Sequence, residues 1–212
     1  MEKSDIDYTL YLCTDRSCLG DKDFYETIRN AVFGGCSVVQ LREKNIETRE
    51  YIRIAKEVRK ITREVSVPLI INDRVDVCMA VDADGVHLGQ EDMEVSMARQ
   101  ILGPDKIIGC SAHNLKEAKK AWEDGADYLG VGAIFSTNTK KNTVDTSIDA
   151  LKEICDTVKL PVVAIGGVKE DNVHLLAQIK IAGIAVVSAI MAKEDSKIAA
   201  RKLRQLVGEI IE

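Results

Sequence analysis

The sequence lacks several features that would assign a protein to a class at once. No segment reaches the roughly 20 consecutive apolar residues that a membrane-spanning helix needs, and the acidic N-terminus, MEKSDIDYTL, has no signal-peptide core. An excess of positive charge is also missing, because 34 Asp and Glu outnumber 29 Lys and Arg. With a net charge of −5, we expect a cytoplasmic protein that acts on small molecules, with no membrane and no nucleic acid among its partners. The sequence leaves homo-oligomer formation undetermined.

Paired cysteine motifs and linkers are absent as well. The cysteines are scattered without a CxxC pair, and several lie in apolar runs, which predicts small buried thiols in a reducing compartment rather than disulfides or a metal cluster. No Pro/Gly/Ser-rich linker and no abrupt change of composition divides the chain, so we predict one domain over residues 1–212. The cysteines are Cys13, Cys18, Cys36, Cys78, Cys110 and Cys155.

Apolar, β-branched runs alternate with amphipathic, charged segments along the whole chain. In the segment 46–64, for example, Tyr51, Ile54 and Val58 recur at helical spacing. Near-continuous apolar strands between helices indicate a parallel sheet covered by helices, and eight repeats favour an α/β fold of the single (β/α)8 TIM-barrel type. A doubly wound open sheet is the alternative. The expected strands are 9–14, 37–41, 68–71, 85–88, 107–110, 128–134, 161–165 and 184–187, and further helices are expected at 115–124 and 198–211.

Polar side chains gather where these strands end, which is where such barrels place their active sites. The second strand ends in QLREK, so Gln40, Arg42 and Lys44 belong on the catalytic face rather than in the core. Arginine offers a planar fork to phosphate oxygens and lysine a mobile point charge. The other polar strand ends are Asn72-Asp73-Arg74, Gln90 and Asp92, Ser111-Ala112-His113, the segment 137–141, Gly166-Gly167 and Val187-Ser188.

Two acids lie at the ends of neighbouring strands. Asp73 and Asp92 can converge there, and Mg²⁺ typically takes one or two carboxylates together with substrate phosphate oxygens. The alternative is that each aspartate caps the helix that follows, which is plausible for Asp92. Two acids beside Arg42, Lys44 and Lys140 favour a Mg²⁺-bound pyrophosphate.

Glycines and hydroxyl groups indicate a second anion site. Gly166-Gly167 and Val187-Ser188 follow the seventh and eighth strands, where barrels often bind a phosphate; a tight turn is the alternative. The stretch 137–139, Thr-Asn-Thr, is suited to gripping an anion, although alone it would be read as a solvated loop tip.

No nucleophile with a paired base stands out, and the cysteines lack an obvious histidine partner. His113 lies near the site, whereas His87, inside a strand, and His174, on a helix, are expected to be structural or exposed. The residues therefore favour charge stabilisation over covalent catalysis.

Taken together, the motifs QLREK, INDRVDV, DGVHLGQEDM, GCSAHN, GADYLGVGAIF, TNTKK, AIGGV and GIAVVSAI resemble the thiamine-phosphate synthase family. The resemblance runs in order over nearly the whole chain. It implies a transferase that couples 4-amino-2-methyl-5-hydroxymethylpyrimidine diphosphate to 4-methyl-5-(2-phosphoethyl)thiazole, giving thiamine phosphate and pyrophosphate. The implied mechanism is dissociative: the pyrimidine C–O bond breaks, the electron-rich ring stabilises the carbenium ion, and the thiazole nitrogen attacks.

The resemblance also implies roles for individual residues. Lys140, Arg42 and Lys44 would stabilise charge on the leaving pyrophosphate, while Glu43 would either point outward or orient Arg42 and Lys44. The implied pyrimidine-diphosphate site is Gln40, Leu41, Arg42, Glu43, Lys44, Asn72, Ser111 and Lys140; the implied Mg²⁺ ligands are Asp73 and Asp92; the implied thiazole-phosphate site is Thr137, Asn138, Thr139, Gly167, Val187 and Ser188.

Some positions depart from the family pattern, and other functions stay open. Ala133 and Ser136 replace prolines expected around the sixth-strand loop, and Ser147-Ile148 stands where a Gly-Leu pair is expected. A thiazole tautomerase would share the AIGG region but would not need two magnesium acids. A sugar-phosphate epimerase or an amino-acid-pathway isomerase should show a paired acid and base. A non-catalytic thiazole-phosphate-binding barrel is the remaining alternative.

Overall fold

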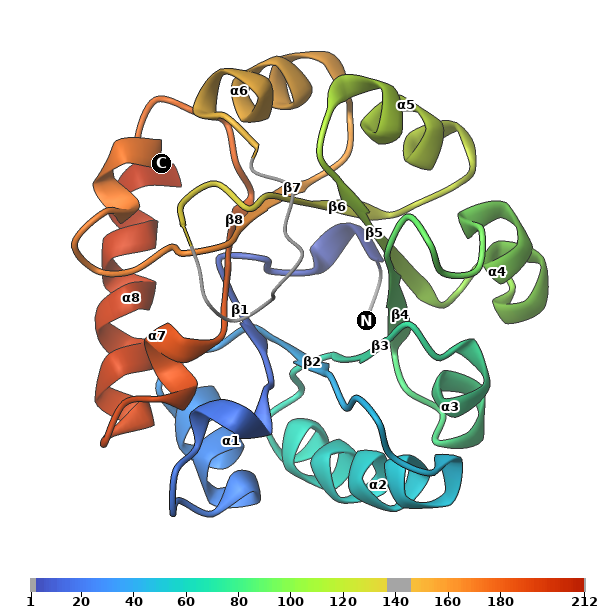
Figure 1. The fold of residues 1–212 in the computed structure, drawn as a ribbon, viewed down its shortest axis with the longest axis vertical. Helices are drawn as coiled ribbons and strands as arrows, with labels where there is room; N and C mark the ends of the chain where they lie inside the picture. Colours follow the sequence, from blue (N-terminus) through green and yellow to red (C-terminus); the bar gives the residue numbers. More distant parts are fainter. Residues whose placement is uncertain (1–2, 137–145, 212) are drawn as a thin grey trace.

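A closed parallel barrel forms the centre of the molecule in the computed structural model, which describes residues 3–136 and 146–211 (Figure 1). Strands β1 to β8 pair in chain order around the barrel, as the (β/α)8 prediction required. The strands are β1 (Leu10–Cys13), β2 (Val38–Leu41), β3 (Leu69–Asn72), β4 (Gly85–Leu88), β5 (Ile107–Ala112), β6 (Tyr128–Val131), β7 (Val162–Ile165) and β8 (Gly183–Val186).

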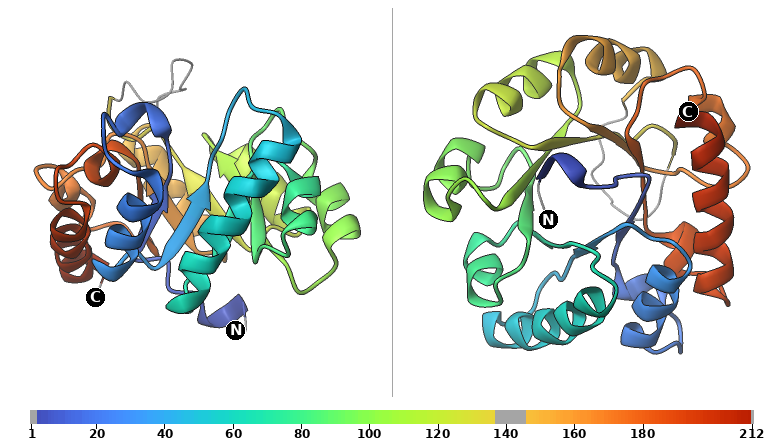
Figure 2. Two further views of the ribbon diagram at one scale, coloured as in Figure 1. Left: turned by 90° about the horizontal axis from the view of Figure 1, so that it is seen from below. Right: turned by 180° about the vertical axis from the view of Figure 1, so that it is seen from behind.

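Helices surround the barrel on the outside (Figures 1 and 2). Within the described ranges, none of them is long and apolar enough to cross a membrane. The helices are α1 (Phe24–Phe33), α2 (Thr48–Glu64), α3 (Val75–Ala80), α4 (Val95–Leu102), α5 (Leu115–Glu123), α6 (Ile148–Thr157), α7 (Ser188–Met191) and α8 (Ser196–Ile211), with 3-10 turns η1 (Lys3–Asp5), η2 (Arg16–Cys18) and η3 (Val173–Leu176).

The segment between β7 and β8 departs from the predicted alternation of strands and helices. It contains the 3-10 turn η3 where an α-helix was expected, and both α7 and α8 follow β8. The reason lies in the apolar spacing: Val173, Leu176 and Ile179 are buried and recur every third residue, which is the period of a 3-10 helix.

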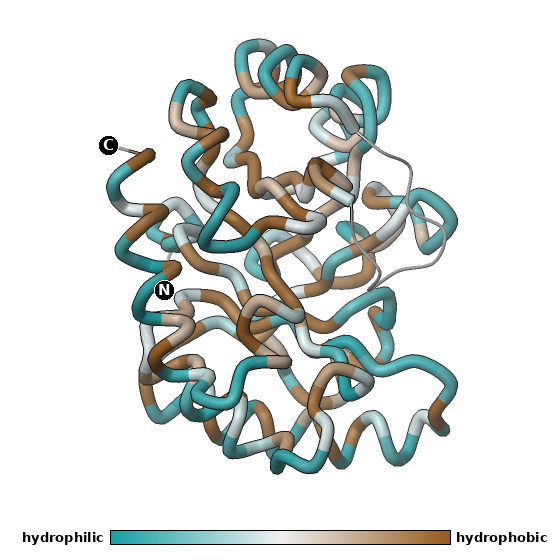
Figure 3. The backbone as a smooth tube through the Cα atoms, turned by 60° about the vertical axis from the view of Figure 1, so that its left-hand side comes forward, coloured by the Kyte–Doolittle hydropathy of each residue, from teal (hydrophilic) through white to brown (hydrophobic). Residues whose placement is uncertain are grey.

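Both faces of the barrel strands are buried, which explains why they read as continuous apolar runs. One set of side chains packs against the helices, and a second set, including Tyr8, Tyr11 and Tyr128, fills the barrel interior. Figure 3 shows hydrophobic stretches in the middle of the molecule and alternating hydrophobic and hydrophilic positions along the outer helices. Gly109 makes room for the central tyrosine, because a Cβ there would lie 2.1 Å from Tyr128 Cζ.

The cysteines follow the predicted pattern in part. Cys13, Cys36, Cys78 and Cys110 are buried free thiols, whereas Cys18 and Cys155 are half-buried. Two of the buried thiols lie near the carboxyl ends of strands, where burial raises the pKa of Cys13 to about 12 and that of Cys110 to about 11. Both therefore stay protonated at neutral pH and are poor nucleophiles.

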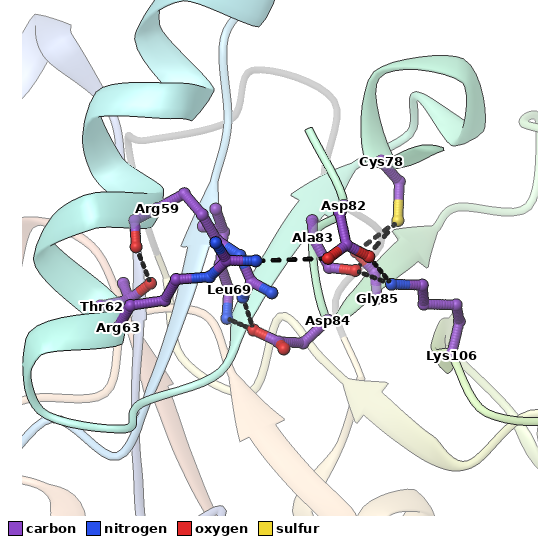
Figure 4. Close-up of polar contacts among 10 residues, drawn as sticks. All are labelled: Arg59, Thr62, Arg63, Leu69, Cys78, Asp82, Ala83, Asp84, Gly85 and Lys106. Carbon is purple, nitrogen blue, oxygen red and sulfur yellow. Dashed lines mark hydrogen bonds and ion pairs between the residues drawn. The ribbon is translucent and has the colours of Figure 1, made fainter. Parts of the chain in front are cut away.

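At the amino-terminal face of the barrel, acidic side chains tie neighbouring strands together (Figure 4). Asp84, just before β4, accepts a hydrogen bond from the Leu69 amide at the start of β3 (2.7 Å) and pairs with Arg59 of α2. Asp127, just before β6, does the same with the Ile108 amide of β5 (2.8 Å) and with Arg99 of α4. These contacts lie at the end opposite to the strand ends that carry the polar motifs, where barrel residues serve stability.

Candidate functional site

A cavity of about 610 Å³ opens at the carboxyl ends of the strands. The structure brings together around it seven of the substrate-site residues that the family resemblance implies, from the ends of β2, β3 and β5 and the loops after β7 and β8. Gly166, Asp15, Lys169 and His113 line it as well. The seven predicted residues that line the cavity are Gln40, Arg42, Asn72, Ser111, Gly167, Val187 and Ser188.

A chain of buried polar side chains forms the floor of this cavity. Gln40 Nε2 donates to the Tyr11 hydroxyl (2.9 Å), which lies 2.7 Å from the Tyr128 hydroxyl. The Tyr128 hydroxyl lies 2.9 Å from His87 Nδ1, and His87 Nε2 lies 3.0 Å from Ser111 Oγ. Five strands thus contribute to one hydrogen-bonded chain, which crosses the barrel from β2 to β5.

The hydrogens along this chain of side chains can all point in one direction. The Gln40 amide nitrogen can only donate, and burial raises the pKa of Tyr11 and Tyr128 well above its ordinary value, so each hydroxyl keeps its hydrogen. If Tyr11 donates to Tyr128 and Tyr128 to His87 Nδ1, the imidazole carries its hydrogen on Nε2 and donates to Ser111. The Ser111 hydroxyl is then left to donate into the cavity.

His87 is a buried strand residue, which agrees with the structural role that we expected. It also lines the cavity and contacts Ser111, which the prediction did not include. Strand alternation explains the placement: His87 is paired with Asn72 in register, and both side chains face the barrel interior. An inward position on a strand end was the signal that could have identified it.

Arg42 is held by the loop that follows β1. Its backbone amide donates to Thr14 Oγ1 (3.0 Å), and its Nη1 donates to Asp15 Oδ2 (2.9 Å). The neighbouring Glu43 pairs instead with Arg16 (2.7 Å), and burial raises the pKa of the Glu43 carboxyl. Within the described residues, the Glu43 carboxylate therefore contacts Arg16 and orients neither Arg42 nor Lys44.

Leu41 faces away from the cavity. Its side chain is fully buried in the layer between barrel and helices, and its carbonyl accepts a hydrogen bond from the Tyr51 hydroxyl (2.7 Å). Strand alternation forces this, because the inward positions on either side are taken by Gln40 and Arg42. Within the described residues, the Leu41 and Glu43 side chains do not line the cavity. Their placement therefore does not support the substrate contacts that we predicted for them.

The two candidate metal acids do converge. Asp73 follows β3 with a φ of 63°, a left-handed conformation that aspartate tolerates better than most residues, and its carboxylate pairs with Lys44. Although Asp92 is exposed as a whole, partial burial of its carboxyl and a hydrogen bond with Asp73 raise its pKa. Two carboxyl groups in contact repel one another unless a proton or cation lies between them.

Asp92 does not cap the following helix. Helix α4 begins at Val95, and Glu94 occupies the N-cap position. The Asp92 carboxylate instead accepts a hydrogen bond from the Gly89 amide (2.7 Å). This contact excludes the interpretation of Asp92 as a helix cap. The oxygen donors of Asp73 and Asp92 fit a hard cation such as Mg²⁺, although no group of three or more His, Cys, Asp or Glu within the described part of the chain could hold a metal.

The glycine pair after β7 meets two separate requirements. Gly166 and Gly167 have φ values of 94° and 66°. A Cβ on Gly167 would also lie 2.6 Å from the Phe135 carbonyl oxygen, so the loop after β6 could not pack where it does. Helix α7 begins at Ser188 beside this turn, and Lys22 Nζ donates to the Met191 carbonyl at its other end (2.7 Å).

His113 has a partner that sequence reasoning missed. Its Nδ1 lies 2.8 Å from Glu117 Oε2, which also accepts from the His113 amide. Asn114 caps helix α5 and accepts from the Glu117 amide (3.0 Å), so Asn114 and Glu117 form a reciprocal cap. The N-x-x-E spacing at residues 114–117 could have indicated this arrangement. The predicted site residues Thr137, Asn138, Thr139 and Lys140 lie outside the described residues.

The fold and the cavity define a (β/α)8-barrel protein with a cavity at the carboxyl ends of its strands. Residues 10–190 match the model of the thiamine monophosphate synthase family, and the chain belongs to this family. It is 50% identical over 209 residues to thiamine-phosphate synthase of Clostridium tetani, covering 99% of this chain and 100% of that protein. It is 47% identical over 199 residues to thiamine-phosphate synthase of Alkaliphilus oremlandii, covering 94% of this chain and 95% of that protein.

A solved structure supports the same relationship. Thiamine phosphate pyrophosphorylase from Pyrococcus furiosus superposes with a TM-score of 0.89 at 42% identity, covering 98% of each chain. The KGPDC structure from Streptococcus mutans superposes with a TM-score of 0.67 at only 13% identity, which shows the shared fold and covers 95% of this chain and 98% of that one.

Proposed function

We propose that this protein is a thiamine-phosphate synthase, a transferase that joins the pyrimidine diphosphate to the thiazole phosphate and releases pyrophosphate. The observation that carries the proposal is the cavity at the strand ends, whose polar lining comes from the motifs that resemble the family: Gln40, Arg42, Asn72 and Ser111. The full-length similarity to enzymes of that name supports it.

The cavity floor is suited to hold an aminopyrimidine ring. Ser111 presents a hydroxyl group, and the Gln40 amide nitrogen donates to the Tyr11 hydroxyl. A ring fixed by such groups keeps its C–O bond aligned for cleavage, and the enclosed barrel interior keeps water away from the carbenium ion. No general base is required, because the thiazole nitrogen attacks with its own lone pair.

The diphosphate would lie between Arg42, which lines the cavity, and the group of Lys44, Asp73 and Asp92. The two aspartates would hold Mg²⁺, which when bound would neutralise charge on the pyrophosphate oxygens. Lys44 lies beside Asp73 in the structure and is half exposed, so its ammonium group can reach toward an incoming phosphate. Arg42 and Lys44 would then stabilise the leaving group.

The thiazole phosphate, in turn, would lie between the loops after β7 and β8. Gly167 and Ser188 both line the cavity there, and Ser188 lies at the start of α7. Thr137 to Thr139 would complete this subsite, and Lys140 would contact the pyrophosphate.

The test is pyrophosphate release from the purified protein. We expect release that requires both substrates and Mg²⁺, and none when the thiazole phosphate is omitted at short times. Binding of the thiazole phosphate without any pyrophosphate release would refute the synthase proposal and favour a tautomerase or a binding protein.

A further inference from the structure

Two ion pairs cross between the loop after β1 and the loop after β2. Asp15 pairs with Arg42, and Arg16 pairs with Glu43, at 2.9 and 2.7 Å. The pairs have the same chemistry and join adjacent positions of the same two loops. They differ in one respect: Asp15 and Arg42 both line the cavity, whereas the Arg16 guanidinium lies over the Phe24 ring.

Asp15 is itself fixed in place. Its Oδ1 accepts from the Ser17 amide (2.9 Å) and the Ser17 hydroxyl (2.6 Å), and its Oδ2 accepts from Arg42. The Asp15 side chain is 13% exposed and that of Arg42 is 25% exposed. A carboxylate with both oxygens engaged, in a mostly buried position, has little freedom to move with the side chain it holds.

The preceding residue anchors the backbone at the same place. The Thr14 amide donates to the Gln40 carbonyl (2.9 Å), and the fully buried Thr14 hydroxyl accepts from the Arg42 amide. Main chain and side chain of Arg42 are therefore both held by residues 14 and 15. A guanidinium has five N–H donors, so one bond to Asp15 leaves others for a second anion.

We propose that Asp15 is a positioning residue for the synthase reaction, acting through Arg42 to hold its guanidinium toward the diphosphate; this rests on the proposed role of Arg42. A carboxylate at the wall of a site for a polyanion opposes binding through like-charge repulsion. Its favourable effect is orientation, because Arg42 is a long side chain that would otherwise sample several rotamers. The acid therefore contributes to the chemical step rather than to affinity.

This placement predicts a separation of kinetic constants. In Asp15→Ala, we expect kcat to fall on the order of 10- to 100-fold, because a displaced guanidinium no longer meets the charge that develops on the leaving group. The KM for the pyrimidine diphosphate should stay the same or fall, since a repulsive charge is removed. The KM for the thiazole phosphate should not change.

A variant set isolates the effect. In Asp15→Asn, the side-chain oxygen can keep the bonds from Ser17 that cap η2, while the amide NH2 that replaces Oδ2 cannot accept from Arg42. This variant therefore tests the pairing in a protein that keeps the cap. Arg16→Gln is the matched control, because it removes the parallel ion pair outside the cavity. We expect both Asp15 variants to lower kcat, and Arg16→Gln to keep wild-type kinetics.

The double variant Asp15→Ala/Arg42→Ala shows whether one residue acts through the other. If it does, the double variant is as slow as Arg42→Ala alone. Multiplied effects of the two substitutions, or wild-type kcat in folded Asp15→Asn, would overturn the positioning role. Wild-type turnover of Arg42→Ala would instead remove the proposed role of Arg42, and with it this inference. Circular dichroism and the thermal midpoint identify variants that fail to fold, and Asp15→Asn decides if Asp15→Ala is one of them.

Discussion

The hydroxyl of Tyr128 lies at the centre of the polar chain on the cavity floor. It connects the Tyr11 hydroxyl to His87 Nδ1, and its ring is fully buried in the barrel interior. Its position depends on Gly109 of the neighbouring strand, so the residue serves packing and the site together. At the scale of single residues, the core and the lining of the cavity are therefore not separate in this barrel.

Replacing Tyr128 by phenylalanine should keep the packing and interrupt the hydrogen-bonded chain of side chains. We expect the free energy of unfolding to fall by about 1–3 kcal/mol, because two buried polar groups lose a partner. We also expect the KM for the pyrimidine diphosphate to rise, because Ser111 loses its fixed orientation. Urea unfolding and steady-state kinetics measure the two effects.

Tyr8→Phe is the matched control for that variant. Tyr8 belongs to the same interior cluster, but the described part of the chain shows no hydrogen bond of its hydroxyl. We expect this variant to behave like the wild type within about 0.5 kcal/mol. Equal losses of unfolding free energy in the two variants would show that the hydrogen-bonded chain contributes no stability of its own.

Asp92→Ala tests the proposed metal acids. We expect Mg²⁺-dependent turnover to fall by at least about 100-fold, because a carboxylate that would hold the cation is removed, while the thermal midpoint changes little at this exposed position. Glu94→Gln, two residues on at the start of α4, is the control. Unchanged turnover of Asp92→Ala across a Mg²⁺ titration would refute the assignment.

At the level of the secondary-structure elements, several side chains that lie just before one strand hold the amino-terminal part of the preceding strand. Asp84 satisfies the first amide of β3, Asp127 satisfies the second amide of β5, and each pairs with an arginine of an outer helix. Ser37, before β2, accepts from the Leu10 amide of β1 in the same way (3.2 Å). The repeat ties adjacent strands together far from the cavity.

Asp84→Ala should therefore destabilise the fold without harming catalysis. We expect a loss of roughly 2–3 kcal/mol in unfolding free energy, because the Leu69 amide and the mostly buried Arg59 lose their partner. Asp82→Ala is the comparison: its side chain is 70% exposed, and its pairs with Arg63 and Lys106 should contribute less than about 1 kcal/mol. A large loss of kcat in folded Asp84→Ala would contradict a purely stabilising role.

At the scale of the whole molecule, barrel closure brings the two ends of the chain together. Asp7, just before β1, pairs with Arg204 of the last helix and accepts a hydrogen bond from the Thr9 amide (2.9 Å). Burial by itself would raise the pKa of Asp7, but the hydrogen bonds from Thr9 and Arg204 outweigh it and lower the pKa below 3.8. Because the folded pKa is lowered, the contribution is present above the unfolded value and is lost as the pH falls through the folded value.

Asp7→Asn should accordingly be less stable than the wild type at pH 7, and the difference should shrink below about pH 4. Thermal unfolding of both proteins between pH 7 and pH 3 measures this convergence. A stability difference that stays constant over the whole range would show that the Asp7 charge does not contribute to closure.

Much of the fold and part of the site could be predicted from local patterns. Alternating apolar runs and amphipathic segments predicted the barrel, and polar strand ends predicted Gln40, Arg42 and Ser111 near one another. The pattern failed where the local signal was ambiguous: η3 replaced a helix because its apolar residues follow a three-residue period, and His87 lay inside an apolar run.

Local sequence patterns were enough to predict the order of the strands and of most helices, and the residue types at the strand ends, because both depend on neighbours within a few positions. Which of these groups meet depends on the tertiary fold. Tyr11 and Tyr128 are 117 positions apart, and Asp15 and Arg42 are 27 apart, yet each pair is in hydrogen-bond contact. Such contacts depend on strand register and barrel closure, which arise when all eight strands pair at once.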